Sequence, residues 1–200
     1  MCRPRSSAIS GRLPSSLSST PNDLSRARAK WRWTGRIRPP FAAAPRAGQE
    51  SVWDYPRPPR VESDPRRVLV RAGDVTVADS TRAVRVLETA SPPAFYVPPD
   101  DVRIDLLRPT ARSSICEWKG RAVYWSVRAG DTLIGDAAWS YPEPFDGYAA
   151  IAGYLSFYPA TLECRVHGEL VEPQPGAFYG GWITSEIVGP VKGAPGTEAW

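Results

Sequence analysis

The chain has 200 residues and a formal net charge of +4, and such a length suits one domain, or a smaller domain with a tail. No apolar run approaches the ~20 residues that span a bilayer, and the N-terminus lacks the apolar stretch of a secretory signal. Three cysteines (Cys2, Cys116, Cys164) with no CxxC pair and no neighbouring His support neither a disulfide framework nor a zinc finger. We therefore expect a cytoplasmic protein with reduced thiols, no contact with a membrane and no cofactor.

The first 49 residues are rich in Ser, Arg, Pro and Ala, and residues 1–60 carry 12 Lys and Arg against three acidic residues. Such a composition buries too little apolar surface to offset the entropy lost on ordering, so we expect residues 1–49 to be a disordered basic extension. Three origins stay open. The segment is a nucleic-acid-binding arm, a targeting-like extension, or the product of a start codon assigned too early. In support of the first, residues 26–38 interleave Arg with Trp31 and Trp33.

Residues 50–200 are expected to form a single domain built from β-hairpins. Valines alternate on both sides of a "RAGD" turn in residues 68–80, and "VRAGD" recurs within residues 126–137. A third hairpin surrounds a two-residue turn at His167 and Gly168.

The strands are short, Gly and Pro are frequent, and no long amphipathic helix is present. These features predict an all-β or β-rich fold, either a small antiparallel barrel or two packed sheets. One short helical segment is expected at residues 100–107, with Asp100 or Asp101 as its cap.

Several stretches of this domain resemble a bacterial and fungal family known as domain of unknown function 427, sometimes labelled nucleotidyltransferase-like. They are "VADSTRAVRVLET", "PPAFYVPPDDV", "CEWKG", "AAWSYPEP" and "IAGYLSFYP". The ending "FYGGWITSEIVGPVKGAPGTEAW" is similar to a longer subgroup of that family. The resemblance implies a small antiparallel fold similar to the β-tent folds, and it implies that residues 1–49 are dispensable. Where the family often has His and Pro beside the cysteine, this chain has Ile115 and Glu117.

The nucleotidyltransferase label does not fit the residues. Such enzymes hold metal ions with paired carboxylates and cradle phosphates with a Gly-rich loop. Asp100 and Asp101 are adjacent, so on a strand they would point apart, and no such loop precedes them. Helix capping explains them better, and we expect no metal site.

The stretch "CEWKG", residues 116–120, brings reactive side chains to the corner of a predicted hairpin. Cys116 is a candidate nucleophile, with Lys119 favouring the thiolate and Glu88 or Asp101 as its partner. Glu117 opposes ionisation, and the only histidine, His167, lies in a distant turn. Cys116, Lys119 and Glu88 are therefore weak catalytic candidates, and a small buried side chain at a strand end explains the cysteine better.

Aromatic side chains are concentrated on the hairpin that follows Cys116 and on its exit loop. Tyr124 and Trp125 must face opposite sides of their strand, so one belongs to the core and the other to a different surface. A Pro-rich loop with aromatic residues could form a pocket wall. The predicted ligand-binding residues are Trp118, Lys119, Trp139, Tyr141, Tyr96 and Glu88.

Three functional hypotheses follow. The first is a small-molecule or peptide-like ligand-binding module with an aromatic pocket. The second is a small enzyme that uses Cys116 or Lys119, and the third is a nucleic-acid-associated protein acting through residues 26–38. The sequence leaves open the ligand, any catalytic activity and the oligomeric state.

Overall fold

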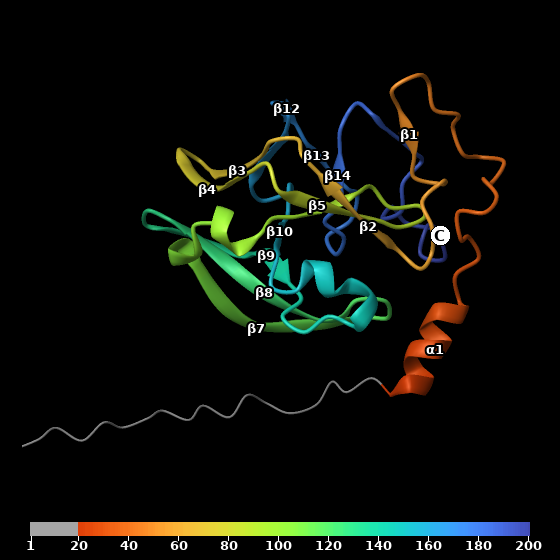
Figure 1. The fold of residues 1–200 in the computed structure, drawn as a ribbon, viewed down its shortest axis with the longest axis horizontal. Helices are drawn as coiled ribbons and strands as arrows, with labels where there is room; N and C mark the ends of the chain where they lie inside the picture. The colour runs from red at the N-terminus through yellow and green to blue at the C-terminus, as the bar shows by residue number, and fades with distance from the viewer. Residues whose placement is uncertain (1–19) are drawn as a thin grey trace, which may run out of the picture.

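A computed structural model describes residues 20–200, which are built largely from antiparallel strands (Figure 1). The longest strands form a four-stranded antiparallel sheet, which we call the central sheet. Its order is β10–β9–β8–β7, with β7 at Leu107–Cys116, β8 at Gly120–Ala129, β9 at Thr132–Ser140 and β10 at Leu155–Phe157.

Two smaller antiparallel sheets accompany the central sheet. One has the order β12–β11–β3–β4, with β12 at Glu169–Leu170, β11 at Glu163–Val166, β3 at Val68–Ala72 and β4 at Val75–Ser80. The other has the order β2–β5–β6, with β2 at Arg60–Asp64, β5 at Ala83–Leu87 and β6 at Ala94–Tyr96.

The remaining elements are short. β1, Glu50–Ser51, pairs in parallel with β15, Ile187–Val188, and β13, Glu172–Pro173, pairs antiparallel with β14, Trp182–Ile183. The helical elements are α1 at Pro21–Ala29 and three 3-10 segments, η1 at Pro99–Asp101, η2 at Ile104–Leu106 and η3 at Asp146–Ile151.

All three predicted hairpins are present, as β3–β4, β8–β9 and β11–β12. In the third, His167 and Gly168 both have positive φ, 51° and 86°, as a tight two-residue turn requires. The predicted β-rich, hairpin-built fold is confirmed, and within residues 20–200 its sheets stay open instead of closing into a barrel. The predicted helical segment at residues 100–107 is present as η1 and η2, although Asp100 and Asp101 both lie inside η1 and neither caps a helix.

One end of the central sheet packs on the β12–β11–β3–β4 sheet through a core of mostly aliphatic side chains, which we call the aliphatic core. Its members alternate along their strands, as strand geometry requires of a sheet with one buried face. They include Val68, Val70, Val77, Val127, Leu155, Phe157, Leu162, Cys164 and Val166.

The other end of the central sheet faces the β2–β5–β6 sheet across side chains of a different kind. Five of these buried residues are tyrosines, and we call the group the tyrosine cluster. It comprises Val86, Tyr96, Ala122, Tyr124, Trp139, Tyr141, Tyr148, Ile151 and Tyr158. Tyr124 belongs to this cluster whereas Trp125 is half-buried against the aliphatic core, so the two neighbouring rings pack against different groups of side chains.

Residues 20–49 contact the rest of the chain, where the sequence indicated disorder. Trp33 and Phe41 meet the buried Trp53 edge-on, with ring centroids 6.0 and 5.2 Å apart, and Phe41 stacks on Trp200 at 4.9 Å. The expectation of disorder is therefore wrong for residues 20–49. Aromatic side chains that are distant in sequence pack against this segment, and composition alone does not reveal such contacts. Residues 1–19 lie outside the described part.

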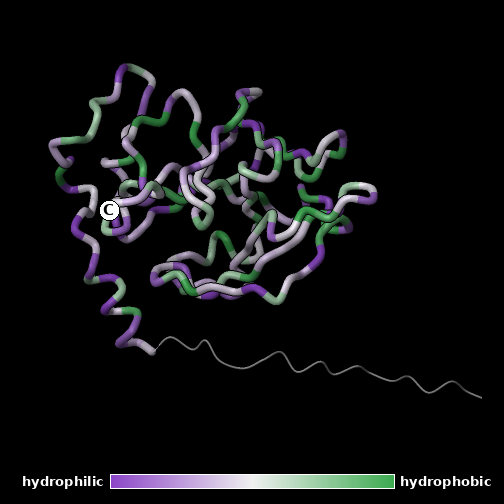
Figure 2. The backbone as a smooth tube through the Cα atoms, turned by 180° about the vertical axis from the view of Figure 1, so that it is seen from behind, coloured by the Kyte–Doolittle hydropathy of each residue, from purple (hydrophilic) through white to green (hydrophobic). Residues whose placement is uncertain are grey.

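Helix α1 is held at its start by a capping box, in which the Thr20 hydroxyl accepts from the backbone N–H of Asp23 and the Asp23 carboxylate accepts from the backbone N–H of Thr20. The helix is predominantly hydrophilic and has no buried residue (Figure 2). Its place beside the sheets therefore depends on polar and cation–π contacts, described below.

In residues 20–200 no helix is both long enough and apolar enough to cross a membrane.

Candidate ligand pocket

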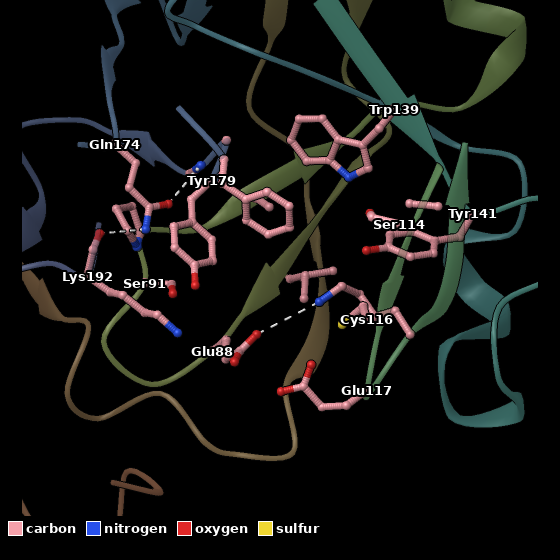
Figure 3. A pocket seen from close by; sticks show the side chains of 18 of the residues that line it. Glu88, Ser91, Ser114, Cys116, Glu117, Trp139, Tyr141, Gln174, Tyr179 and Lys192 are labelled. Atoms are coloured by element: carbon pink, nitrogen blue, oxygen red, sulfur yellow. Dashed lines mark hydrogen bonds and ion pairs between the residues drawn. The ribbon is translucent and has the colours of Figure 1, made fainter. Parts of the chain in front are cut away.

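A cavity of about 340 Å³ lies between the tyrosine cluster, residues 30–31 and the C-terminal segment (Figure 3). Its wall combines aromatic rings, cationic side chains and two carboxylates. The lining residues include Lys30, Trp31, Glu88, Tyr96, Ser114, Cys116, Glu117, Lys119, Tyr124, Trp139, Tyr141, Tyr158, Gln174, Phe178, Tyr179, Gly180, Gly181 and Lys192.

Strand register explains the aromatic wall. Tyr124 on β8 lies opposite Trp139 on β9, so both rings project from one face of the central sheet. The Trp139 indole donates a hydrogen bond of 3.1 Å from Nε1 to Tyr96 Oη, which arrives from β6. Burial raises the pKa of Tyr96 to about 12, so its hydroxyl stays protonated at neutral pH.

The "CEWKG" stretch is the corner of the β7–β8 hairpin, as predicted, with Cys116 paired to Gly120. Lys119 in this corner is only 8% exposed, and its Nζ lies 3.8 Å from Glu88 Oε2. Burial by itself disfavours the ammonium, but Cys116, Glu88 and Tyr96 around it outweigh burial, so the pKa of Lys119 is raised. Lys119 is therefore a permanent positive charge in the wall.

Trp118 is the one predicted ligand-binding residue that does not line the cavity. The Arg28 guanidinium of α1 lies 5.2 Å from the centroid of its ring, and Arg28 Nε donates a hydrogen bond of 2.8 Å to the carbonyl of Glu117. The indole thus packs against the tyrosine cluster and contacts Arg28 of α1 without lining the cavity.

Glu88 follows β5 and is held between two cations. Arg57 Nε donates to Glu88 Oε1 at 3.2 Å on one side, and Lys119 lies on the other. The same guanidinium donates to the carbonyls of Trp33 and Thr89. Burial lowers the pKa of Arg57, yet a guanidinium stays protonated at any physiological pH. The negative charge of Glu88 is therefore compensated by Arg57 and Lys119 and is not available to a ligand.

The C-terminal segment closes one side of the cavity through a pair of glycines. A Cβ on Gly180 would lie 2.4 Å from Trp139 Cη2, and a Cβ on Gly181 would lie 2.4 Å from Gln174 Oε1. Gly181 donates its backbone N–H to Gln174 Oε1 at 3.0 Å, and Gln174 Nε2 donates to the carbonyl of Lys192 at 2.8 Å. The glycines thus let this segment approach the pocket closely.

Lys192 is 2% exposed and enters the cavity from the C-terminal segment (Figure 3). Its Nζ lies 3.6 Å from the centroid of the Trp31 ring and 4.9 Å from that of Tyr179. In residues 20–200 no carboxylate forms an ion pair with it. Burial lowers the pKa of Lys192 to about 8, with Arg57 and Lys30 adding to the effect and Glu88 opposing it.

The Trp31 ring forms the cation–π contact with Lys192. Its Nε1 donates a hydrogen bond of 2.6 Å to Glu117 Oε1, and Arg57 Cζ lies 4.3 Å from its ring centroid. Trp31 and Trp33, the two rings in the nucleic-acid hypothesis, are both half-buried against other residues of the chain. That hypothesis stays a prediction.

Of the predicted site residues, the structure brings Glu88, Tyr96, Cys116, Lys119, Trp139 and Tyr141 together around one cavity. Asp100 and Asp101 do not line it, and Asp101 pairs instead with Arg82 at 2.6 Å. Among residues 20–200 no group of three or more His, Cys, Asp or Glu is placed to hold a metal ion.

Sequence reasoning missed the lining residues that precede and follow the main sheets, above all Trp31, Tyr179 and Lys192. The double glycine next to Tyr179 was one available signal. The scarcity of lysine was another, because the chain has only Lys30, Lys119 and Lys192.

A protein-family model described as "Domain of unknown function (DUF427)" matches residues 60–171, more than half of the chain. The chain belongs to this family. No curated protein matches it significantly. Trp31 and Lys192 lie outside the matched residues, so the cavity joins a wall from the DUF427 domain to walls from both flanking segments.

Proposed function

We propose that this DUF427 protein binds a small planar organic molecule that carries an acidic group. The observation that carries the proposal is the cavity of about 340 Å³ lined by aromatic rings and lysines. Ligand pockets of proteins commonly start near ~300 Å³ and combine apolar walls with a few convergent polar groups.

The aromatic walls favour a flat ligand. Trp139, Tyr96 and Tyr158 are buried and fixed against one another, with Trp139 and Tyr158 centroids 4.6 Å apart. Rigid rings lose little conformational entropy when a ligand stacks on them, so binding to such a wall costs little ordering.

The charges favour an acid over a cation as the ligand. Glu88 is engaged by Arg57 and Lys119, and Glu117 accepts a hydrogen bond from Trp31. Lys192, by contrast, has no carboxylate partner in residues 20–200, and an incoming carboxylate or phosphate would supply one.

The test uses 4-methylbenzoate as probe and two matched tryptophan variants. Trp139→Phe removes an indole that lines the cavity, whereas Trp125→Phe removes one from the adjacent strand that packs on the aliphatic core. Each indole also donates one hydrogen bond, to Tyr96 and to Ser140 respectively. We expect calorimetric binding of the probe to weaken at least about tenfold in Trp139→Phe, a loss of about 1.4 kcal/mol, and to persist in Trp125→Phe. Equal affinity in both variants would place the ligand elsewhere.

A second candidate function is thiol chemistry, because the cavity wall contains Cys116 next to the buried Lys119 ammonium. Cys164 provides an internal comparison, since it lies in the aliphatic core, where burial raises its pKa. Iodoacetamide at pH 7 should then label Cys116 in the folded protein and spare Cys164. A Cys116 that stays unlabelled until the protein unfolds would remove this candidate.

A further inference from the structure

The lysines of this chain are few and are gathered in one place. Of 25 basic residues only Lys30, Lys119 and Lys192 are lysines, and all three line the same cavity. Lysine is a common surface residue and is almost never buried without a partner. Here two of the three are buried, and arginine takes every other basic position.

Lysine and arginine differ in what they can do chemically. A guanidinium remains protonated and serves as a fixed charge, whereas a desolvated amine can release its proton and become a nucleophile. A chain that uses arginine everywhere except around one cavity therefore has its only side-chain amines where a ligand would lie.

The two buried lysines have opposite surroundings. Lys119 lies beside Cys116 and Glu88, which favour its ammonium form. Lys192 is buried near other cations, and its pKa is lowered to about 8. Roughly a tenth of such an amine is unprotonated at pH 7, far more than for an ordinary lysine. Groups around one cavity whose pKa values are pushed apart are typical of acid–base and nucleophilic sites.

We propose that Lys192 is a nucleophile, whose Nζ forms a reversible imine with an aldehyde or ketone group of the ligand in this cavity. The inference rests on the proposed ligand-binding function and narrows its ligand class to a small planar carbonyl compound with an acidic group.

The reaction balances without an oxidant or reductant. The lone pair of the neutral amine attacks the carbonyl carbon, and one N–H proton moves to the carbonyl oxygen to give a neutral carbinolamine. A proton from solvent then converts the hydroxyl to water, the C–O bond breaks as the water leaves, and the nitrogen lone pair forms a protonated C=N bond. One water is released, and the reverse reaction with water restores both partners.

The surroundings of Lys192 suit the charged product of this reaction. The Trp31 ring lies 3.6 Å from Nζ and Tyr179 lies 4.9 Å away. A protonated imine carries a positive charge close to the atom that carried the ammonium charge, so the same ring faces can stabilise it. The hydrogen bond from Gln174 to the Lys192 carbonyl fixes the backbone from which the side chain extends.

The experiment uses the full chain, 4-carboxybenzaldehyde as carbonyl probe and 4-methylbenzoate as its analogue without a carbonyl. Sodium cyanoborohydride converts any imine to a stable secondary amine, and peptide mass spectrometry assigns it to Lys30, Lys119 or Lys192. We expect saturable labelling at Lys192, at least tenfold faster than at the exposed Lys30. Excess 4-methylbenzoate should suppress it.

Variants separate charge from nucleophilicity. Lys192→Arg keeps a cation without a reactive amine, so it should bind 4-methylbenzoate and give no adduct at this position. Lys192→Met should give none either. Arg128→Met, which removes an exposed basic residue of β8 outside the cavity, should be labelled like the wild type. If Lys192→Met does not fold, the distribution of label over the three lysines of the wild type still decides.

The outcomes distinguish this inference from the proposed function. Binding of both probes with labelling that is slow, spread evenly or centred on Lys119 would overturn the imine and leave ligand binding intact. Labelling at Lys192 that 4-methylbenzoate does not suppress would support the nucleophile and count against the acid-binding pocket. If neither probe binds and Lys192 stays unlabelled, both proposals fail for this ligand class.

Discussion

The two ends of the central sheet are packed in different ways. Toward the β12–β11–β3–β4 sheet, Val70, Val127 and Phe157 form a tightly buried aliphatic core. Toward the β2–β5–β6 sheet, tyrosines and Trp139 surround a cavity. Aliphatic side chains pack without gaps. The rigid rings at the other end leave a cavity between them, and their hydroxyl groups line it. The difference indicates that one end of the sheet provides stability and the other is available for a ligand.

The largest effect should come from opening the aliphatic core. Phe157→Ala removes a fully buried ring of β10, and we expect the free energy of unfolding to fall by about 3–5 kcal/mol. Chemical denaturation measures it. Tyr141→Phe is the matched change on the other side, since its hydroxyl lines the cavity without a hydrogen-bond partner in residues 20–200. Its cost should stay below about 1 kcal/mol. Similar losses of unfolding free energy in Phe157→Ala and Tyr141→Phe would contradict the conclusion that the aliphatic core stabilises the fold more than the tyrosine cluster does.

A smaller effect is expected from filling the contact between the C-terminal segment and the tyrosine cluster. The Cβ of Gly180→Ala would overlap Trp139, so the indole must shift. We expect a loss of about 1–3 kcal/mol in stability and weaker binding of 4-methylbenzoate. Gly135→Ala is the control, because a Cβ at Gly135 on β9 meets nothing within 4 Å. Unchanged binding in Gly180→Ala would show that the position of Trp139 does not matter.

Removing the Trp31 ring should have a more modest effect on stability. Trp31→Leu deletes the ring that faces Lys192 and the hydrogen bond to Glu117, with an expected cost of about 1–2 kcal/mol. Hydrogen exchange should quicken around Lys192 and stay unchanged in β3. Trp31→Phe retains a ring and should lie between Trp31→Leu and the wild type. Faster exchange in β3 as well would mean that residues 20–49 support the whole fold and not just the pocket.

A dependence of stability on pH is expected as well, and it develops above pH 7. In the folded protein Lys192 loses its proton at a pKa of about 8, whereas in the unfolded chain it stays protonated to about 10.4. The unfolded state binds more protons between these values, so stability rises with pH there. The wild type should therefore gain stability relative to Lys192→Met between pH 7 and 10 in denaturation experiments. A difference that is constant across this range would indicate an ordinary, solvated lysine.

Local sequence patterns were sufficient for the hairpins. The turn at His167 and Gly168 and the repeated "VRAGD" act over a few residues, so their conformation is decided by neighbours in the chain. The same holds for the separation of Tyr124 from Trp125, because alternate residues of a strand face opposite sides. These patterns also predicted that Lys119, Trp139 and Tyr141 would lie near one another, since all three belong to one hairpin and its exit loop.

Contacts between distant segments could not be predicted in this way. Trp118 was expected in the pocket and instead contacts Arg28 of α1, which belongs to a segment that composition indicated to be disordered. Lys192 lies more than 70 residues from Lys119 in sequence, and nothing local brings it to the cavity or surrounds it with Trp31 and Tyr179.

The sequence by itself determined the β-rich class, the hairpins, the family resemblance and one wall of the pocket, because each depends on short-range pattern. Only the tertiary structure decided that segments on both sides of the DUF427 domain close that pocket and that all three lysines line it. The physical reason is that burial, ion pairing and the proton affinity of an amine depend on which groups surround it in space, and those groups come from parts of the chain that periodicity does not connect.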